Sequence, residues 1–228
     1  KKRKTIQKSY FKTQNITNVS SDELLKAACC NISESFETNP SIDVNYSNAV
    51  TGVKQVKMLG WESPYLLITE ENIPMIRGAS QVYGLSFIPG TWVESMQITK
   101  GSGSVVNGFE SVSGQINVEL KKPYSDSPFF VNVYTNNMGR NEINIHGNKI
   151  INDNLSTGLY LHANKNTSIN DKNNDGFLDN PTSNAFNIFN RWQYINTQKG
   201  TVSFLGIRYM KDEKEIGEST DDMVFIRE

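Results

Sequence analysis

The feature that most constrains this chain is a series of alternating segments after residue 123. Apolar and polar side chains alternate along five segments, which are residues 129–137, 141–150, 155–166, 184–195 and 200–211. Alternation with a period of two predicts β-strands with one apolar and one polar face, because successive side chains of a strand point to opposite sides. The second half of the chain should therefore be an antiparallel array of strands.

Two architectures explain this alternation equally well. A strand of about 9–11 residues crosses a bilayer at a tilt, and in a membrane barrel its apolar face meets lipid. A soluble β-sandwich with one solvated face gives the same pattern. Aromatic residues near the segment ends, as an interfacial girdle requires, are Phe129, Phe130, Trp192, Tyr194 and Tyr209. The alternation alone leaves both architectures open.

Composition excludes several classes of protein. The formal net charge is −1 over 228 residues, whereas nucleic-acid-binding domains carry a strong basic excess, so we expect no nucleic-acid partner. The sequence contains neither G-x-S-x-G nor H-E-x-x-H, and we expect no enzyme. The only cysteines, Cys29 and Cys30, are neighbours and cannot form a disulfide scaffold. A soft-metal site, a vicinal disulfide and two buried apolar side chains are their alternative roles.

The first half of the chain has shorter elements. Residues 1–20 are basic and then polar, and we expect a linker there. Short helices are expected over 22–28 and 32–38. Short strands, separated by turns rich in Gly and Pro, are expected over 53–59, 65–69, 93–100 and 114–120. Residues 21–122 should therefore form an α+β domain, which ends where the composition changes at Lys121-Lys122-Pro123.

Residues 84–122 carry several short motifs in a fixed order. They are Pro89, Glu94, an alternating strand to Lys100, then Gly101, Gly108, Gly114 and Ile116-Asn117-Val118. This order resembles the end of the plug domain of TonB-dependent outer-membrane receptors. The resemblance implies that 21–122 is the plug and that 123–228 holds the first strands of the outer-membrane β-barrel. We expect the three glycines to have a positive φ or to lie close to the barrel wall.

The resemblance also implies a function. Such receptors bind a scarce nutrient outside the cell and import it, energised through the TonB complex. The implied cargo is a small molecule or metal chelate of the siderophore or cobalamin type, and the implied location is the outer membrane, in contact with its lipid. Aromatic and charged side chains in the plug turns are expected to contact cargo; these are Trp61, Tyr65, Arg77 and Tyr83.

The chain also differs from the family pattern. Met58-Leu59-Gly60 stands where many members have Ile-Arg-Gly, and Glu71-Asn72 stands where many have Asp-Gly. Barrels of this family have about 22 strands, so we expect further strands after Glu228. The segment that contacts TonB is expected upstream of residue 1.

A second motif lies between the third and fourth segments. Asp171, Asn173 and Asp175, followed by Gly176, match the start of a Ca²⁺-binding loop. The Phe177 carbonyl would add a ligand, and Asp179 would replace the missing glutamate at position 12. We therefore expect a structural Ca²⁺ site; the alternative is a polar hairpin loop without an ion. A secreted, calcium-stabilised β-rich adhesion module is the competing function, but it leaves the glycine pattern at 101–118 unexplained.

Overall fold

A computed structural model shows two compact units, Lys1–Ser47 with Val53–Asp126, and Asn48–Gly52 with Ser127–Glu228. Within the residues that the structure describes, no helix is long and apolar enough to cross a membrane. The described residues are 6–9, 15–21, 43–48, 53–61, 63–75, 77–78, 84–103, 105–172, 174, 176–179, 181–215 and 217.

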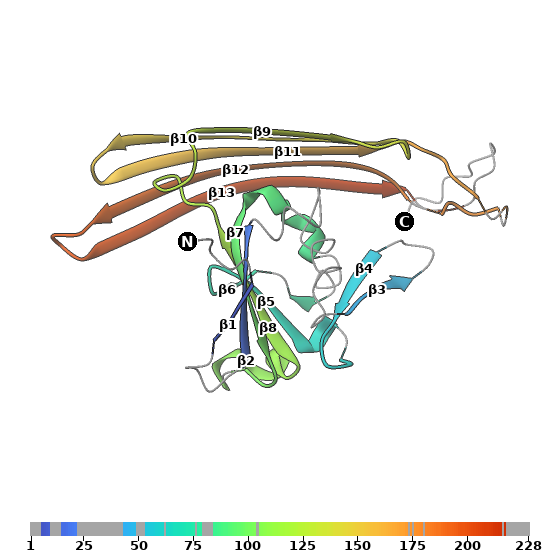
Figure 1. Ribbon diagram of the computed structural model, residues 1–228, viewed down its shortest axis with the longest axis horizontal. Coiled ribbons are helices and arrows are strands. Elements are labelled where there is room, and N and C mark those ends of the chain that lie inside the picture. Colours follow the sequence, from blue (N-terminus) through green and yellow to red (C-terminus); the bar gives the residue numbers. More distant parts are fainter. Residues whose placement is uncertain are drawn as a thin grey trace. The chain divides into compact units, whose positions relative to one another are not determined.

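The first unit is built on a six-stranded sheet with the order β1-β2-β7-β8-β5-β6 (Figure 1). Its strands are β1 (Ile6–Ser9), β2 (Asn15–Ser20), β5 (Leu66–Glu70), β6 (Ile73–Pro74), β7 (Val93–Lys100) and β8 (Gly114–Leu120). Strands β5 and β8 are parallel, and the other pairs are antiparallel. A separate two-stranded sheet joins β3 (Asp43–Asn48) to β4 (Val53–Lys57). Short 3-10 turns are η2 (Ser63–Tyr65), η4 (Gly84–Phe87), η5 (Gly90–Trp92) and η6 (Val105–Ser111).

The core of this unit lies against its central strands. Leu66, Leu67 and Ile68 of β5 are all buried, because a parallel strand inside a sheet is covered on both faces. Trp92 is 1% exposed and is one of the largest fully buried side chains. Burial of these groups from water supplies the main stabilisation of the unit.

The expectation of a linker over residues 1–20 is wrong. Strand β2 pairs with β7 from Asn15↔Lys100 to Ser20↔Ser95, and β1 pairs with β2. Ile16 and Val19 are buried. A polar segment with only two large apolar residues folds here because its backbone completes the ladder of a more apolar neighbour. The two expected helices, 22–28 and 32–38, and the cysteine pair lie outside the described residues.

The other expected strands of this unit are confirmed. Strands β7 and β8 have the bounds that alternation predicts, and β4 and β5 differ from expectation by one or two residues. Gly101 and Gly108 have φ angles of +87° and +65°, the left-handed conformation that favours glycine. Their expected role is therefore confirmed.

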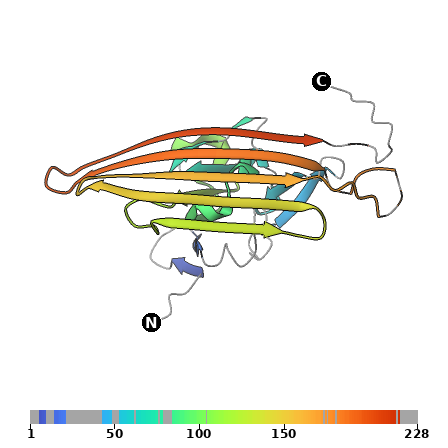
Figure 2. The ribbon, with the colours of Figure 1, turned by 90° about the horizontal axis from the view of Figure 1, so that it is seen from above.

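The second unit is a five-stranded antiparallel sheet with the order β13-β12-β11-β10-β9 (Figure 2). The strands are β9 (Phe129–Thr135), β10 (Arg140–Asn152), β11 (Leu155–Asn166), β12 (Thr182–Asn196) and β13 (Thr201–Glu215). Each strand pairs with the next one along the chain. All five predicted strands are present.

The two faces of this sheet differ in polarity, as the alternation predicts. The register aligns one residue of each strand in an apolar row, formed by Val131, Ile145, Leu161, Ile188 and Tyr209. The opposite face carries buried polar side chains, among them Asn144, His162 and Asn187. His162 Nδ1 lies 2.8 Å from Asn144 Oδ1, and Asn144 Nδ2 donates to Glu142 Oε1 at 2.9 Å.

A row of stacked side chains crosses the polar face. It consists of Phe130, His146, Tyr160, Phe189 and Arg208, one from each strand. The ring centroids of Phe130 and His146 are 4.6 Å apart, and those of His146 and Tyr160 are 5.0 Å apart. The Arg208 guanidinium lies 4.7 Å from the centroid of Phe189. If the pairing of a strand shifted by one residue, the side chain that this strand contributes to the row would move to the apolar face. The row therefore helps to fix the register.

Candidate functional site

The plug sheet has two ends with different chemistry. At one end β5 and β8 begin, at Leu66↔Gly114, and β7 ends at Lys100. We call this the loop end, because η2 and η6 lie there. At the opposite end β8 finishes at Leu120, and the chain leaves the first unit after Asp126. We call this the exit end.

Two of the expected cargo-contacting residues form an aromatic pair at the loop end. Trp61 and Tyr65 lie edge to face, with ring centroids 5.1 Å apart. Two backbone hydrogen bonds between Met58 and Trp61 close the turn before them. The Tyr65 carbonyl accepts hydrogen bonds from Ser113 N and Ser113 Oγ at 3.0 and 2.7 Å. The two residues remain 49% and 39% exposed, so the scaffold fixes them without burying them.

A third expected residue lies at the same end. Arg77 Nε donates to Glu110 Oε2 of η6 at 2.9 Å, where the arginine side chain is 58% exposed and the glutamate side chain 17%. The pair therefore ties the segment after β6 to η6. Tyr83 lies outside the described residues.

The most exposed apolar residues of this end were not predicted from the sequence. Val105, Val106 and Phe109 of η6 are 97%, 93% and 69% exposed, and η6 packs against η2. Two adjacent valines between Gly103 and Gly108 were the available signal, since such a pair is unusual in a glycine-rich loop. Together with Trp61 and Tyr65 they form what we call the loop-end patch.

The loop-end patch has the chemistry of a binding surface. Exposed aromatic rings provide flat apolar surface and bind cations or other rings through their faces. Clustered apolar side chains on an exposed surface commonly mark an interaction site. Arg77 adds a charge whose position is set by Glu110. This chemistry suits recognition of a partly apolar ligand.

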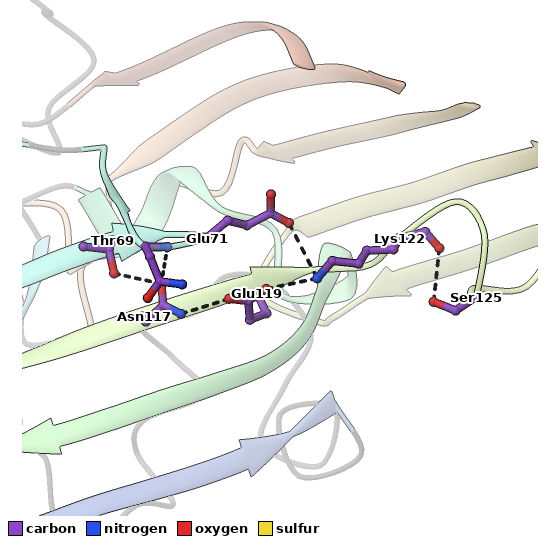
Figure 3. Close-up of polar contacts among 7 residues, drawn as sticks. Thr69, Glu71, Asn117, Glu119, Lys122 and Ser125 are labelled. Carbon is purple, nitrogen blue, oxygen red and sulfur yellow. Dashed lines mark hydrogen bonds and ion pairs between the residues drawn. The ribbon is translucent and has the colours of Figure 1, made fainter. Parts of the chain in front are cut away.

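The exit end carries a polar network centred on Asn117, shown in Figure 3. Asn117 is 4% exposed. Its Oδ1 accepts hydrogen bonds from Thr69 Oγ1 and from Asn72 N, both at 2.8 Å. Its Nδ2 donates to Glu119 Oε1 at 3.0 Å. A buried amide is thus hydrogen-bonded at both atoms, as buried polar groups generally are.

Lys122 extends the network toward the segment that leaves the unit. Its Nζ lies 3.0 Å from Glu119 Oε2 and 3.9 Å from Glu71 Oε1. Its carbonyl accepts a hydrogen bond from Ser125 N at 3.0 Å and one from Ser125 Oγ at 3.5 Å (Figure 3). The network therefore joins β5, the turn after it, β8 and the residues that follow β8.

The expected Ca²⁺ loop is described only in part. Asn173 and Asp175 lie outside the described residues. Asp171 Oδ2 accepts a hydrogen bond from Gly176 N, and Asp179 Oδ2 accepts one from Lys172 N, each at 2.9 Å. Both carboxylates therefore point into the loop and close it. Gly176 has a φ of +85°, the sharp turn that the motif requires. Among the described residues, no group of three or more His, Cys, Asp or Glu side chains is placed so that it could hold a metal ion.

Comparison with known proteins identifies the first unit. Residues 9–115 match the TonB-dependent receptor plug domain, whose start agrees with the inclusion of β2 in the sheet. No curated protein matches the chain. The plug match disfavours the adhesion-module alternative.

Several solved receptors share the fold. The ferric-catecholate import receptor Fiu from E. coli K12 matches with a TM-score of 0.67 and 15% identity, over 89% of this chain and 28% of its own. FpvA of P. aeruginosa, solved with bound pyoverdines, matches with a TM-score of 0.73 and 16% identity. The match covers 90% of this chain and 26% of FpvA. The siderophore receptor PirA from Acinetobacter baumannii matches with a TM-score of 0.66 and 18% identity. The match covers 87% of this chain and 32% of PirA.

The chain therefore spans about a third or less of the length of these receptors. Proteins with this plug domain are receptors of the outer membrane. Residues 9–115 are therefore a plug domain of the TonB-dependent receptor family, and the antiparallel strand array that follows them shares its fold with the solved receptors.

Proposed function

We propose that the receptor containing this chain binds a metal chelate outside the cell and imports it with energy delivered through TonB. The observation that carries the proposal is the plug domain over residues 9–115. The siderophore receptors that share its fold support a ferric chelate as cargo. Cobalamin-type chelates are the second candidate class.

The loop-end patch is the part of the plug that we propose contacts the cargo. It lies at the end of the sheet away from the exit end, where the chain passes on to the barrel strands. In a plug that fills a barrel, these two ends face opposite sides of the membrane. Exposed rings held by backbone hydrogen bonds, as at Trp61 and Tyr65, suit recognition because little ordering is needed on binding.

The full-length receptor tests this function directly. It should be expressed in a host that lacks its own chelate receptors, with and without TonB, and offered a panel of radiolabelled ferric siderophores and cobalamin. We expect accumulation of at least one chelate, and only in the TonB-containing host. Equal accumulation in both hosts would contradict energised import, and surface binding of none of the chelates would contradict the cargo class.

Trp61→Ala should weaken binding of whichever chelate is imported. Loss of one anchoring aromatic side chain at a binding site costs more than about 1 kcal/mol, which corresponds to a Kd at least about fivefold higher. Equilibrium binding to intact cells measures the change. Tyr124, an exposed aromatic residue at the exit end, supplies the control, and Tyr124→Ala should leave the Kd unchanged. A Kd shifted equally by both substitutions would contradict the assignment of the patch.

We also propose that the loop over residues 171–179 binds Ca²⁺. Extracellular sites of this kind have a Kd of about 10⁻⁴–10⁻³ M, so about 10 mM Ca²⁺ should stabilise the receptor by roughly 1.4–2.7 kcal/mol. The melting temperature should fall in chelator, and Asp171→Ala should remove this difference whereas Lys172→Ala should not. An unchanged melting temperature in chelator, with no heat on calcium titration, would refute the site.

A further inference from the structure

We propose that the β5–β6 hairpin couples the two ends of the plug: its turn is latched to β8 at the exit end, and its second strand leads to the Arg77–Glu110 pair at the loop end. Displacement of Arg77 would then release the latch. The inference rests on the proposed function, because it takes the loop end as the place where cargo arrives.

The turn of this hairpin has an uncommon backbone. Glu70 pairs with Ile73, so Glu71 and Asn72 form a two-residue turn. Their φ angles are +52° and +65°, a conformation in which glycine is usual and other residues are strained. Many plug domains have glycine where Asn72 stands, as the resemblance indicates. Residues with a strained backbone persist only where neighbouring groups hold them, so the contacts of this turn decide whether it keeps its conformation.

The hydrogen bonds that hold the turn come from β8. Glu71 N donates to the Val118 carbonyl at 2.9 Å, and Asn72 N donates to Asn117 Oδ1 at 2.8 Å. Both amides of the strained residues are thus bonded to a single neighbouring strand. Asn117 is buried and is itself oriented by Thr69 Oγ1. These bonds form the latch.

The outer part of the latch is weaker. Lys122 bridges Glu119 and Glu71, and its side chain is 29% exposed. Ion pairs with this much exposure contribute little to stability. A modest perturbation can therefore break them while the buried strands β7 and β8 stay intact. This is the property required of an element that changes state within a stable domain.

The second strand connects the latch to the loop end. Strand β6 has only two residues, which pair as Thr69↔Pro74 and Glu70↔Ile73, and Ile73 is 68% exposed. Arg77 follows closely after Pro74 in the chain, so at most about 10 Å of backbone joins them. A cargo that moves Arg77 away from Glu110 must therefore pull on β6, and the turn is its nearest attachment.

Hydrogen exchange of the full-length receptor, without cargo, tests the coupling. Asn117→Ala should speed exchange of the Glu71 and Asn72 amides by roughly five- to tenfold, the effect of losing one or two hydrogen bonds. Adding Asn72→Gly to Asn117→Ala should restore protection of the Glu71 amide, which keeps the Val118 carbonyl as its acceptor, because glycine adopts the turn without strain. The amide of residue 72 should stay unprotected, because its acceptor is gone. Arg77→Gln should speed exchange of the same amides, by about threefold or more. Asn18→Ala, on β2 in the same sheet, removes only an exposed hydrogen bond from Gln97; it is the control and should leave the exchange of these amides unchanged.

Each outcome decides a separate part of the proposal. Unchanged exchange in Asn117→Ala would refute the latch, and unchanged exchange in Arg77→Gln would refute the coupling. If Asn117→Ala fails to fold, Thr69→Val replaces it, because Thr69 Oγ1 orients Asn117. Faster exchange of the Asn72 amide in Thr69→Val supports the latch, and unchanged exchange refutes it. Because no cargo is present, failure of the coupling leaves the proposed import untouched, and failure of the uptake experiment leaves the exchange result standing.

Discussion

Gly114→Val should strongly destabilise the plug, because position 114 has no room for a side chain. A Cβ at this position would lie 2.5 Å from the Thr99 carbonyl oxygen and would also collide with Met58 Sδ. The sulfur can move, but the carbonyl belongs to β7, which pairs with β8 along its length. Overpacking typically costs about 1–3 kcal/mol; we expect Gly114→Ala within that range and Gly114→Val above it.

Urea denaturation of the full-length receptor, followed by hydrogen exchange of the plug strands, measures this effect. The midpoint for the plug should fall for alanine and fall further for valine. Gly147→Ala provides a matched control, because a Cβ at Gly147 would meet nothing closer than the Pro128 carbonyl oxygen at 3.8 Å. If both glycine substitutions shift the midpoint equally, close approach is not the reason for glycine at position 114.

The strands that alternation predicted well are those whose two faces differ in burial. In β8, Ile116 and Val118 are fully buried whereas Gln115 and Glu119 are partly exposed, so the sequence carries the period directly. The same contrast defines β7 and β11, whose observed bounds agree with the predicted ones. Local sequence specifies these elements because alternate positions along each strand belong to the more buried face and the more exposed face.

The elements that were missed depend on partners distant in sequence. Strand β2 is mostly polar and folds as the neighbour of β7. Strand β6 contains Pro74, and proline is confined to the edges of sheets; β6 lies at the sheet edge. Neither position can be inferred from a local pattern. Tertiary pairing decides both.

The candidate site was predicted in part for a similar reason. Turn aromatics and an arginine were identified at Trp61, Tyr65 and Arg77, because they offer stacking surface and charge; their contact with cargo stays a prediction. The role of Asn117 was missed. The motif around Asn117 predicts a strand. The two hydrogen bonds that its Oδ1 accepts, however, come from Thr69 and Asn72, which lie far earlier in the chain. Only the parallel pairing of β5 with β8 brings them together.

Leu161→Arg should destabilise the inserted barrel strands. Leu161 lies near the middle of β11 in the apolar row, opposite Ile145 on one side and Ile188 on the other. An arginine on the lipid-facing side of a membrane barrel costs about 2–4 kcal/mol near the midplane but only about 0–1 near the interfaces. Leu155→Arg, at the start of the same strand on the same face, should therefore cost much less. Folding of the full-length receptor into phospholipid vesicles, followed by urea titration, measures both. Equal costs at the two positions would mean that this face does not meet lipid, whereas a cost concentrated at Leu161 would place the middle of β11 in the hydrocarbon core.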